Sequence, residues 1–304
     1  MRIGVSLSSS LGPGPGDTPH TVAARMIERA AVAHRAGLSS LTVGDHHAMP
    51  GFYQQNTPIL GRLLAEWTAR PAGCLFLLPL WSPVLVAEHI GTLAGLVDAP
   101  FIVQTGIGRG ADQFASMGAD HGRRGAVTDE ALRVITGLLA GERMESPMLG
   151  VGPTRLGLRP EQPVEWWIGG HAPAALRRAA HWGHAWYAGP GLADHDAAQL
   201  VEAHRVACAE AGVEARAIVR QDALVLADGA AARARAEEVV AAGYRGMGVD
   251  QLLVGGPDEA ATRIDALGRL GFEQVIVRCV AAEQDLALET LELLGRVNQE
   301  LGGP

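Results

Sequence analysis

Lysine is absent from the 304-residue chain, so its 25 basic side chains are all arginines, and 33 acidic side chains outnumber them. The formal net charge is −8 at pH 7, and the arginines are scattered along the chain. Sequence-independent binding of nucleic acid depends on clustered cations. No nucleic-acid partner is therefore expected.

Cysteines are few and widely separated, and their number is odd: Cys74, Cys208 and Cys279. No two of them have the spacing of a metal or redox pair, so the sequence predicts a reduced, cytoplasmic protein and no metal site. Long hydrophobic runs are also lacking. The most apolar window, residues 73–97, is interrupted by two prolines, a glutamate and a histidine, which argues against a membrane span.

What the sequence does contain is a repeated order of helix, glycine and apolar strand. Thr18 is placed to cap a helix with Pro19 in its first position, and Gly37 is placed to end it before a strand at 41–43. Further strands are expected at 2–7, 73–78, 101–105, 164–168, 184–187, 218–226 and 274–279. Helices are expected at 59–70, 84–97, 123–140, 174–182, 197–211 and 260–270, and a last helix is expected to end at 301.

About eight strands that alternate with helices predict a parallel sheet. Over a chain somewhat longer than about 250 residues, the pattern favours an α/β fold of the (β/α)8 TIM-barrel type. A doubly wound open sheet is the competing architecture. No low-complexity linker divides the chain, so we expect a single domain over residues 1–304, with insertions at about 142–163 and 228–258.

Asp45, His46 and His47 follow the short strand at 41–43, and a loop rich in proline and glycine comes next. In a barrel, side chains at the carboxyl ends of the strands face the active site. Zinc binding is disfavoured because adjacent histidines at a strand end point in opposite directions. The alternative is that Asp45 caps a loop and that one histidine packs in the core.

Two glycine-containing segments also follow strands. Thr105, Gly106, Gly108 and Arg109 partly match a dinucleotide-binding pattern, but the following strand with an acidic end is missing, so these glycines instead suggest close approach of a planar ligand. Gly169, Gly170 and His171 precede a helix with proline in its first turn, which suits binding of a phosphate. An ordinary structural turn is the alternative reading for each segment.

Four stretches, in this order, resemble the bacterial luciferase-like monooxygenase family: Ala36-Gly37-Leu38 with Val43 to His47; Leu78-Pro79 with Pro83 to Glu88; Gly106-Ile107-Gly108 with Gln113-Phe114 and Met117-Gly118; and Ile168-Gly169-Gly170 with Ala179-Ala180 and Gly183. A weaker match covers Gly255 to Glu259 and Leu270 to Phe272. No single motif is decisive, but the ordered set is fairly specific.

The resemblance implies a luciferase-like barrel with FMN or coenzyme F420 at its mouth, a small-molecule substrate and a possible homodimer. It places His46 near the reactive centre of the ring as a catalytic group, with Asp45 to orient it. It also implies a cis peptide between Cys74 and Leu75 near the cofactor, ring or ribityl contacts at Thr105, Gly106 and Gly108, and phosphate contacts at Gly169, Gly170 and His171.

Arg109 is a departure, because deazaflavin dehydrogenases of this family often carry an acid at this place. The chain is thus expected to be an oxidoreductase that transfers a hydride or activates oxygen at a reduced flavin or deazaflavin. A nicotinamide-dependent dehydrogenase of the Rossmann type and a non-catalytic flavin-binding barrel are the alternatives.

Overall fold

A closed barrel of eight parallel strands forms the centre of the computed structural model, which describes residues 1–8 and 16–303. Neighbouring strands pair in the order β1, β2, β3, β4, β7, β8, β9 and β11, and β11 pairs with β1 to complete the ring. The strands are β1 (Arg2–Leu7), β2 (Leu41–Val43), β3 (Ala72–Leu77), β4 (Phe101–Gly106), β7 (Val164–Gly169), β8 (Ala185–Ala188), β9 (Ala217–Val225) and β11 (Gln274–Cys279). The predicted (β/α)8 barrel is confirmed, and the open-sheet alternative is wrong.

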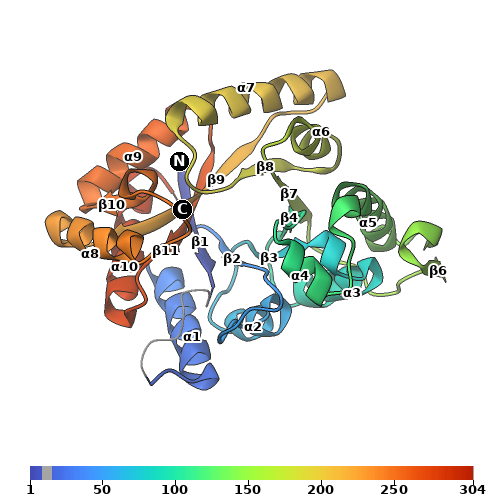
Figure 1. The fold of residues 1–304 in the computed structure, drawn as a ribbon, viewed down its shortest axis with the longest axis horizontal. Helices are drawn as coiled ribbons and strands as arrows, with labels where there is room; N and C mark the ends of the chain where they lie inside the picture. The colour runs from blue at the N-terminus through green and yellow to red at the C-terminus, as the bar shows by residue number, and fades with distance from the viewer. Residues whose placement is uncertain (9–15, 304) are drawn as a thin grey trace.

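Helices surround this ring of strands (Figure 1). They are α1 (Pro19–Arg35), α2 (Asn56–Leu63), α3 (Pro83–Ala94), α4 (Ala111–Ser116), α5 (Arg124–Leu139), α6 (Pro173–Trp182), α7 (Asp194–Ala211), α8 (Gly229–Ala241), α9 (Pro257–Arg269) and α10 (Gln284–Glu300). Thr18 caps α1 as expected: its side chain accepts a hydrogen bond from the Thr21 amide, and Pro19 is the first helical residue.

The expected helix at 59–70 is instead α2, which begins at Asn56 and ends at Leu63. Proline is tolerated in a first helical turn, so Pro58 does not prevent the earlier start. From Ala65 onward the amides bond back three residues rather than four, for example Glu66 to Leu63, and the chain leaves the helix in tight turns.

The two segments interpreted as insertions have regular structure of their own. Residues 142–163 contain an antiparallel hairpin of β5 (Met144–Ser146) and β6 (Val151–Thr154). Residues 228–258 contain α8 and a short strand, β10 (Leu253–Gly255), which adds to β9 outside the ring. The second segment therefore returns the chain to the barrel beside β9.

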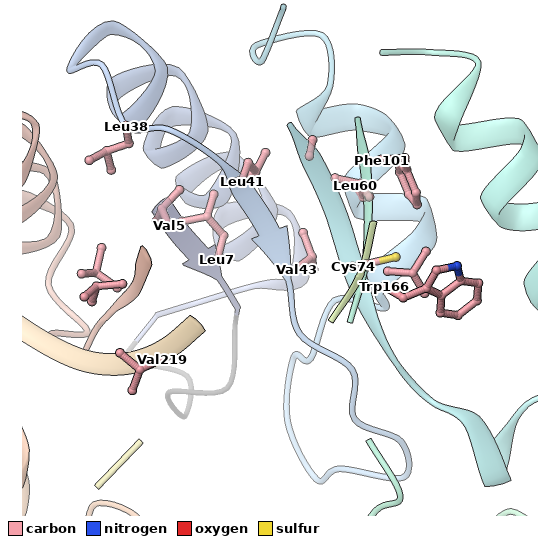
Figure 2. Close-up of a cluster of buried hydrophobic side chains, with 14 of the residues drawn as sticks. Val5, Leu7, Leu38, Leu41, Val43, Leu60, Cys74, Phe101, Trp166 and Val219 are labelled. Carbon is pink, nitrogen blue, oxygen red and sulfur yellow. The ribbon is translucent and has the colours of Figure 1, made fainter. Parts of the chain in front are cut away.

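The pleat of the strands separates two cores. Side chains such as Val5, Val43 and Cys74 point outward and pack with helix residues such as Leu60 in the main cluster (Figure 2). Alternate positions point into the barrel, where Trp167, Tyr187 and neighbours on other strands form a smaller cluster. This alternation decides which side chain of each strand can reach the mouth.

Asn298 fastens the last helix to the first strand. This fully buried side chain accepts a hydrogen bond from the Ile3 amide at 2.7 Å and donates one to the Gly37 carbonyl at 2.9 Å. It thus joins α10, β1 and the turn after α1 by contacts that span nearly the whole chain.

Replacement of Asn298 by alanine should lower the free energy of unfolding by about 2–4 kcal/mol, because a buried donor and a buried acceptor lose their partners. Urea denaturation measures the change. The neighbouring substitution Gln299→Ala, on the exposed side of the same helix, is the matched control and should have little effect. Equal stabilities of the two variants would contradict this role for Asn298.

Candidate active site

The first group at the mouth is the segment after β2, where alternation turns His46 inward and Asp45 outward. Asp45 has a fully buried side chain, and its Oδ2 accepts hydrogen bonds from the Leu77 amide and from Trp81 Nε1, both at 2.8 Å. Its Oδ1 lies 3.1 Å from His47 Nε2. Asp45 therefore ties the end of β2 to the end of β3 and holds His47, whereas the expectation was that it orients His46.

His46 has a different partner, Gln113 of α4. The Gln113 Nε2 atom lies 3.0 Å from His46 Nδ1 and also donates to the His47 carbonyl at 3.1 Å. Because the amide is the donor, His46 Nδ1 is the acceptor, and a neutral imidazole carries its proton on Nε2. In the sequence, Gln113 stands out only as part of a family motif. The sequence does not show that its side chain points inward from α4 toward His46.

The environment of His46 favours this neutral form. Burial is the main cause that lowers its pKa below the usual value, and the nearby charges of His47 and Arg245 lower it further, while Asp45 opposes them. Arg245 follows α8, about two hundred residues along the chain, so its effect on His46 places both groups in one electrostatic neighbourhood.

The second group follows β4. Gly106 lies on the inner face, where a Cβ would come 3.0 Å from Leu77 Cδ2. Gly108 has φ +71°, and a Cβ there would meet the Phe114 ring at 2.7 Å. Thr105 is buried and lies on the outer face of the strand, so its side chain points away from the mouth. Arg109 is exposed, and its carbonyl lies 3.0 Å from His121 Nε2.

The third group follows β7. A Cβ on Gly169 would come 2.6 Å from the Thr105 carbonyl oxygen, and Gly170 has φ +127°. The protein's own packing thus requires glycine at 169, independently of any ligand. His171 Nε2 accepts a hydrogen bond from the Gly189 amide at 3.2 Å, and burial, followed by the charge of Arg109, lowers the pKa of His171.

Cys74 and Leu75 differ from expectation. Cys74 is fully buried in the outer core, and Leu75 is turned inward beside Gly106. The peptide bond between them is trans, and β3 keeps a regular parallel register with β4 through both residues, Cys74 opposite Val103 and Leu75 opposite Gln104. The cis peptide that the resemblance implies is absent here.

Sequence reasoning missed a further set of inward-facing residues on the other side of the mouth. They are Arg220 and Asp222 of β9, Tyr244 and Arg245 after α8, and Arg278 of β11. A signal for three of them was charge on inward positions of apolar strands, at Arg220 and Asp222 of β9 and at Arg278 of β11. These residues lie within the strands, whereas the expected sites follow strand ends, and no comparable signal marks Tyr244 and Arg245.

A model of the luciferase-like monooxygenase family matches residues 1–271. The chain belongs to this family. Among curated proteins, uncharacterized proteins of Mycobacterium tuberculosis and Mycobacterium bovis are 30% identical over an alignment of 191 residues, which covers 55% of this chain and 66% of those proteins. This member of the family thus matches just under two thirds of the length of these relatives.

Solved structures share the fold of this luciferase-like protein at low identity. Monooxygenase RslO1 from Streptomyces bottropensis has a TM-score of 0.83 and 17% identity, with 99% of this chain and 100% of that one covered. The oxygenating constituent of 3,6-diketocamphane monooxygenase from Pseudomonas putida, in complex with FMN, gives 0.81 and 16%, and an F420-dependent secondary alcohol dehydrogenase gives 0.78 and 16%, with 97% of both chains covered in each case.

Among the described residues, no helix is long and apolar enough to cross a membrane, and no group of three or more His, Cys, Asp or Glu side chains is placed to hold a metal ion.

Burial is the main cause that lowers the pKa values of the half-buried His46 and His171 and of the buried His204, as it also does for His34. The unfolded chain therefore takes up protons on them at a higher pH than the folded chain does. The free energy of unfolding should therefore be highest above the pKa of the unfolded histidines, about 6.5, and should fall as the pH drops below this value.

Urea denaturation between pH 7.5 and 5.5 measures this loss of stability (a range chosen around the ordinary imidazole pKa of about 6.5). Replacing His46, His171 and His204 together with glutamine should make the free energy of unfolding less dependent on pH. If the free energy of unfolding of the triple variant depends on pH as strongly as that of the unchanged protein, these histidines are not the cause of the pH dependence.

Proposed function

We propose that the protein is an oxidoreductase that uses a reduced flavin or deazaflavin, bound noncovalently at the barrel mouth, on a small-molecule substrate. One observation carries the proposal: segments after β2, β4 and β7 meet at one rim. Gln113 joins the β4 segment to His46, and the charge of Arg109 acts on His171. A single tricyclic molecule with a phosphate can contact all three.

The residues at the β7 end suit the phosphate of either cofactor. The N-cap of α6, Ala172, makes no side-chain hydrogen bond to the first turn. Pro173 has no amide hydrogen and the Ala175 amide bonds to the Ala172 carbonyl, so the Ala174 amide is the one that a phosphate could use at this helix start. Arg109 supplies a positive charge close enough to affect His171. On the inner face, the buried side-chain amide of Gln104 lies near the Tyr187 hydroxyl and is a candidate donor to the ring.

The bound cofactor would supply a hydride, or electrons for the activation of oxygen. His46 would then act as a hydrogen-bond donor through Nε2, since Gln113 occupies Nδ1. A donor fixed in this way stabilises negative charge that develops on the reacting group, without the need for a charged imidazolium. Asp45 would contribute indirectly, by holding the strand end and Trp81 in place.

Both alternatives remain distinguishable from this proposal. A Rossmann-type dehydrogenase requires an open sheet, whereas this sheet is closed. A non-catalytic flavin-binding barrel would bind FMN or F420 and show neither oxygen uptake nor substrate reduction with any reductant.

Titration with FMN, coenzyme F420 and riboflavin, each followed by fluorescence, tests the cofactor site. We expect tight binding of one phosphate-bearing cofactor. If the protein binds FMN, the affinity for FMN should exceed that for riboflavin, which lacks the phosphate. If the protein binds F420, the affinity for F420 itself is measured.

In the variant Arg109→Gln, the affinity for that cofactor should fall about three- to tenfold, because an exposed arginine contributes modestly to phosphate binding. Arg143→Gln, at an exposed position away from the rim, is the control. Failure to bind either cofactor would contradict the proposed function.

The variant His46→Ala should lower turnover about tenfold or more while cofactor affinity stays nearly the same, because the lost hydrogen bond acts on the reacting group. Steady-state kinetics and cofactor titration separate the two effects. His195→Ala, on the exposed face of α7, is the control and should retain full turnover. Unchanged turnover in His46→Ala would rule out this role.

A further inference from the structure

Three arginines gather around one carboxylate on the side of the mouth formed by β9 and β11. Alternation places Ile218, Arg220 and Asp222 of β9 on the inner face, with Ile218 in the barrel's inner core. Arg278 of β11 is the direct neighbour of Asp222 in the parallel register. The loop after α8 adds Arg245.

Asp222 is already fully engaged. Its side chain has no exposure, and its two oxygens accept hydrogen bonds from Arg220 Nε at 3.0 Å and from the Tyr244 hydroxyl at 2.9 Å. Arg245 Nε lies 3.7 Å from Oδ2. The carboxylate thus balances one of the positive charges and has little capacity left for another.

Of the three arginines in this cluster, Arg278 is the one without a counterion. The residue is 6% exposed, its Nε has no hydrogen-bond partner, and no ion pair or hydrogen bond of its guanidinium occurs within residues 1–8 and 16–303. A buried charge without a partner is costly unless something else pairs with it. The charges of Arg220 and Arg278 also help to lower the pKa of Arg245, after burial.

A pocket of about 410 Å³ opens beside this cluster, lined by Arg278, Arg245, Tyr244 and Val280 among others. Its volume is that of a small-ligand site. Glu238 also lines the pocket, but it is paired with Arg235. The pocket therefore offers a positive wall to a ligand.

The place of the cluster in the ring separates it from the proposed phosphate site. Along the ring, β11 is three strands from β7, four strands from β4 in either direction, and two strands from β2, which precedes His46. The charge of Arg245 also contributes to lowering the pKa of His46, after burial. A group held here would lie across the mouth from the β4 loop and near the proposed catalytic side chain.

We propose that Arg278, with Arg220 and Arg245, binds a carboxylate of the substrate, so that the enzyme acts on an organic acid. The proposal rests on the proposed function for the identity of the reaction but not for binding. A guanidinium recognises a carboxylate through paired hydrogen bonds, and such a ligand would supply the missing counterion.

Calorimetry with benzoate and with its neutral analogue benzamide tests the proposal on cofactor-free and cofactor-loaded protein. Benzoate should bind in both states, at least about tenfold more tightly than benzamide, and should raise the melting temperature. Arg278→Gln should weaken benzoate binding about tenfold or more. Arg278→Lys, which keeps the charge, should recover part of the affinity.

The stability of Arg278→Gln distinguishes a binding residue from a structural one. Because the substitution removes an unpaired buried charge, the melting temperature without ligand should stay the same or rise. Arg205→Gln, an exposed residue of α7, is the control for both measurements. Cofactor affinity should change in neither variant.

Three results would overturn the proposal: equal affinity for benzoate and benzamide, no saturable binding of benzoate below about 10 mM, or a loss of FMN or F420 affinity in Arg278→Gln that would assign the cluster to the cofactor phosphate. Failure of both cofactors to bind would contradict only the proposed function, because benzoate binding to the cofactor-free protein is measured separately.

Discussion

Closure of the parallel sheet through the pairing of β8 with β9 is the constraint on which the site depends. In a closed parallel barrel every strand ends at the same rim, so segments distant in sequence converge there. Closure returns the β7 and β8 side of the sheet to β9, so the segments after β2, β4 and β7 and the arginines of β9 and β11 surround one opening. An open sheet would leave β9 and β8 at separate positions and would not form the rim.

The pleat then assigns different tasks to adjacent residues. Asp45 and His46 are neighbours, but the first faces the outer side and fastens two strand ends, while the second faces the mouth. Cys74 and Leu75 divide in the same way between the outer core and the interior. The roles of such neighbours cannot be distinguished from side-chain chemistry alone. They are distinguished by the face of the sheet on which each side chain lies.

Charge is distributed unevenly around the rim. The side near β7 carries an uncapped helix start, Arg109 and a histidine with a lowered pKa. The side near β9 and β11 carries Arg220, Arg245 and Arg278 around the single carboxylate of Asp222. Two separate sets of anion-attracting groups suit a reaction with two partners, a phosphate-bearing cofactor and an acidic substrate. The segment at 228–258, interpreted from the sequence as an insertion, supplies Tyr244 and Arg245 to the second set.

The sequence by itself determined the alternation of strands and helices, the cap at Thr18 and the order of family motifs, because each depends on local preferences or on short spacings. It did not determine the start of α2, the trans peptide after Cys74 or the partner of His46. The partner of His46 depends on a contact between remote segments, because Gln113, which follows β4, lies beside the end of β2. Arg278 lies beside Asp222 only because β11 pairs with β9, so tertiary structure alone showed that this arginine has no counterion among the described residues.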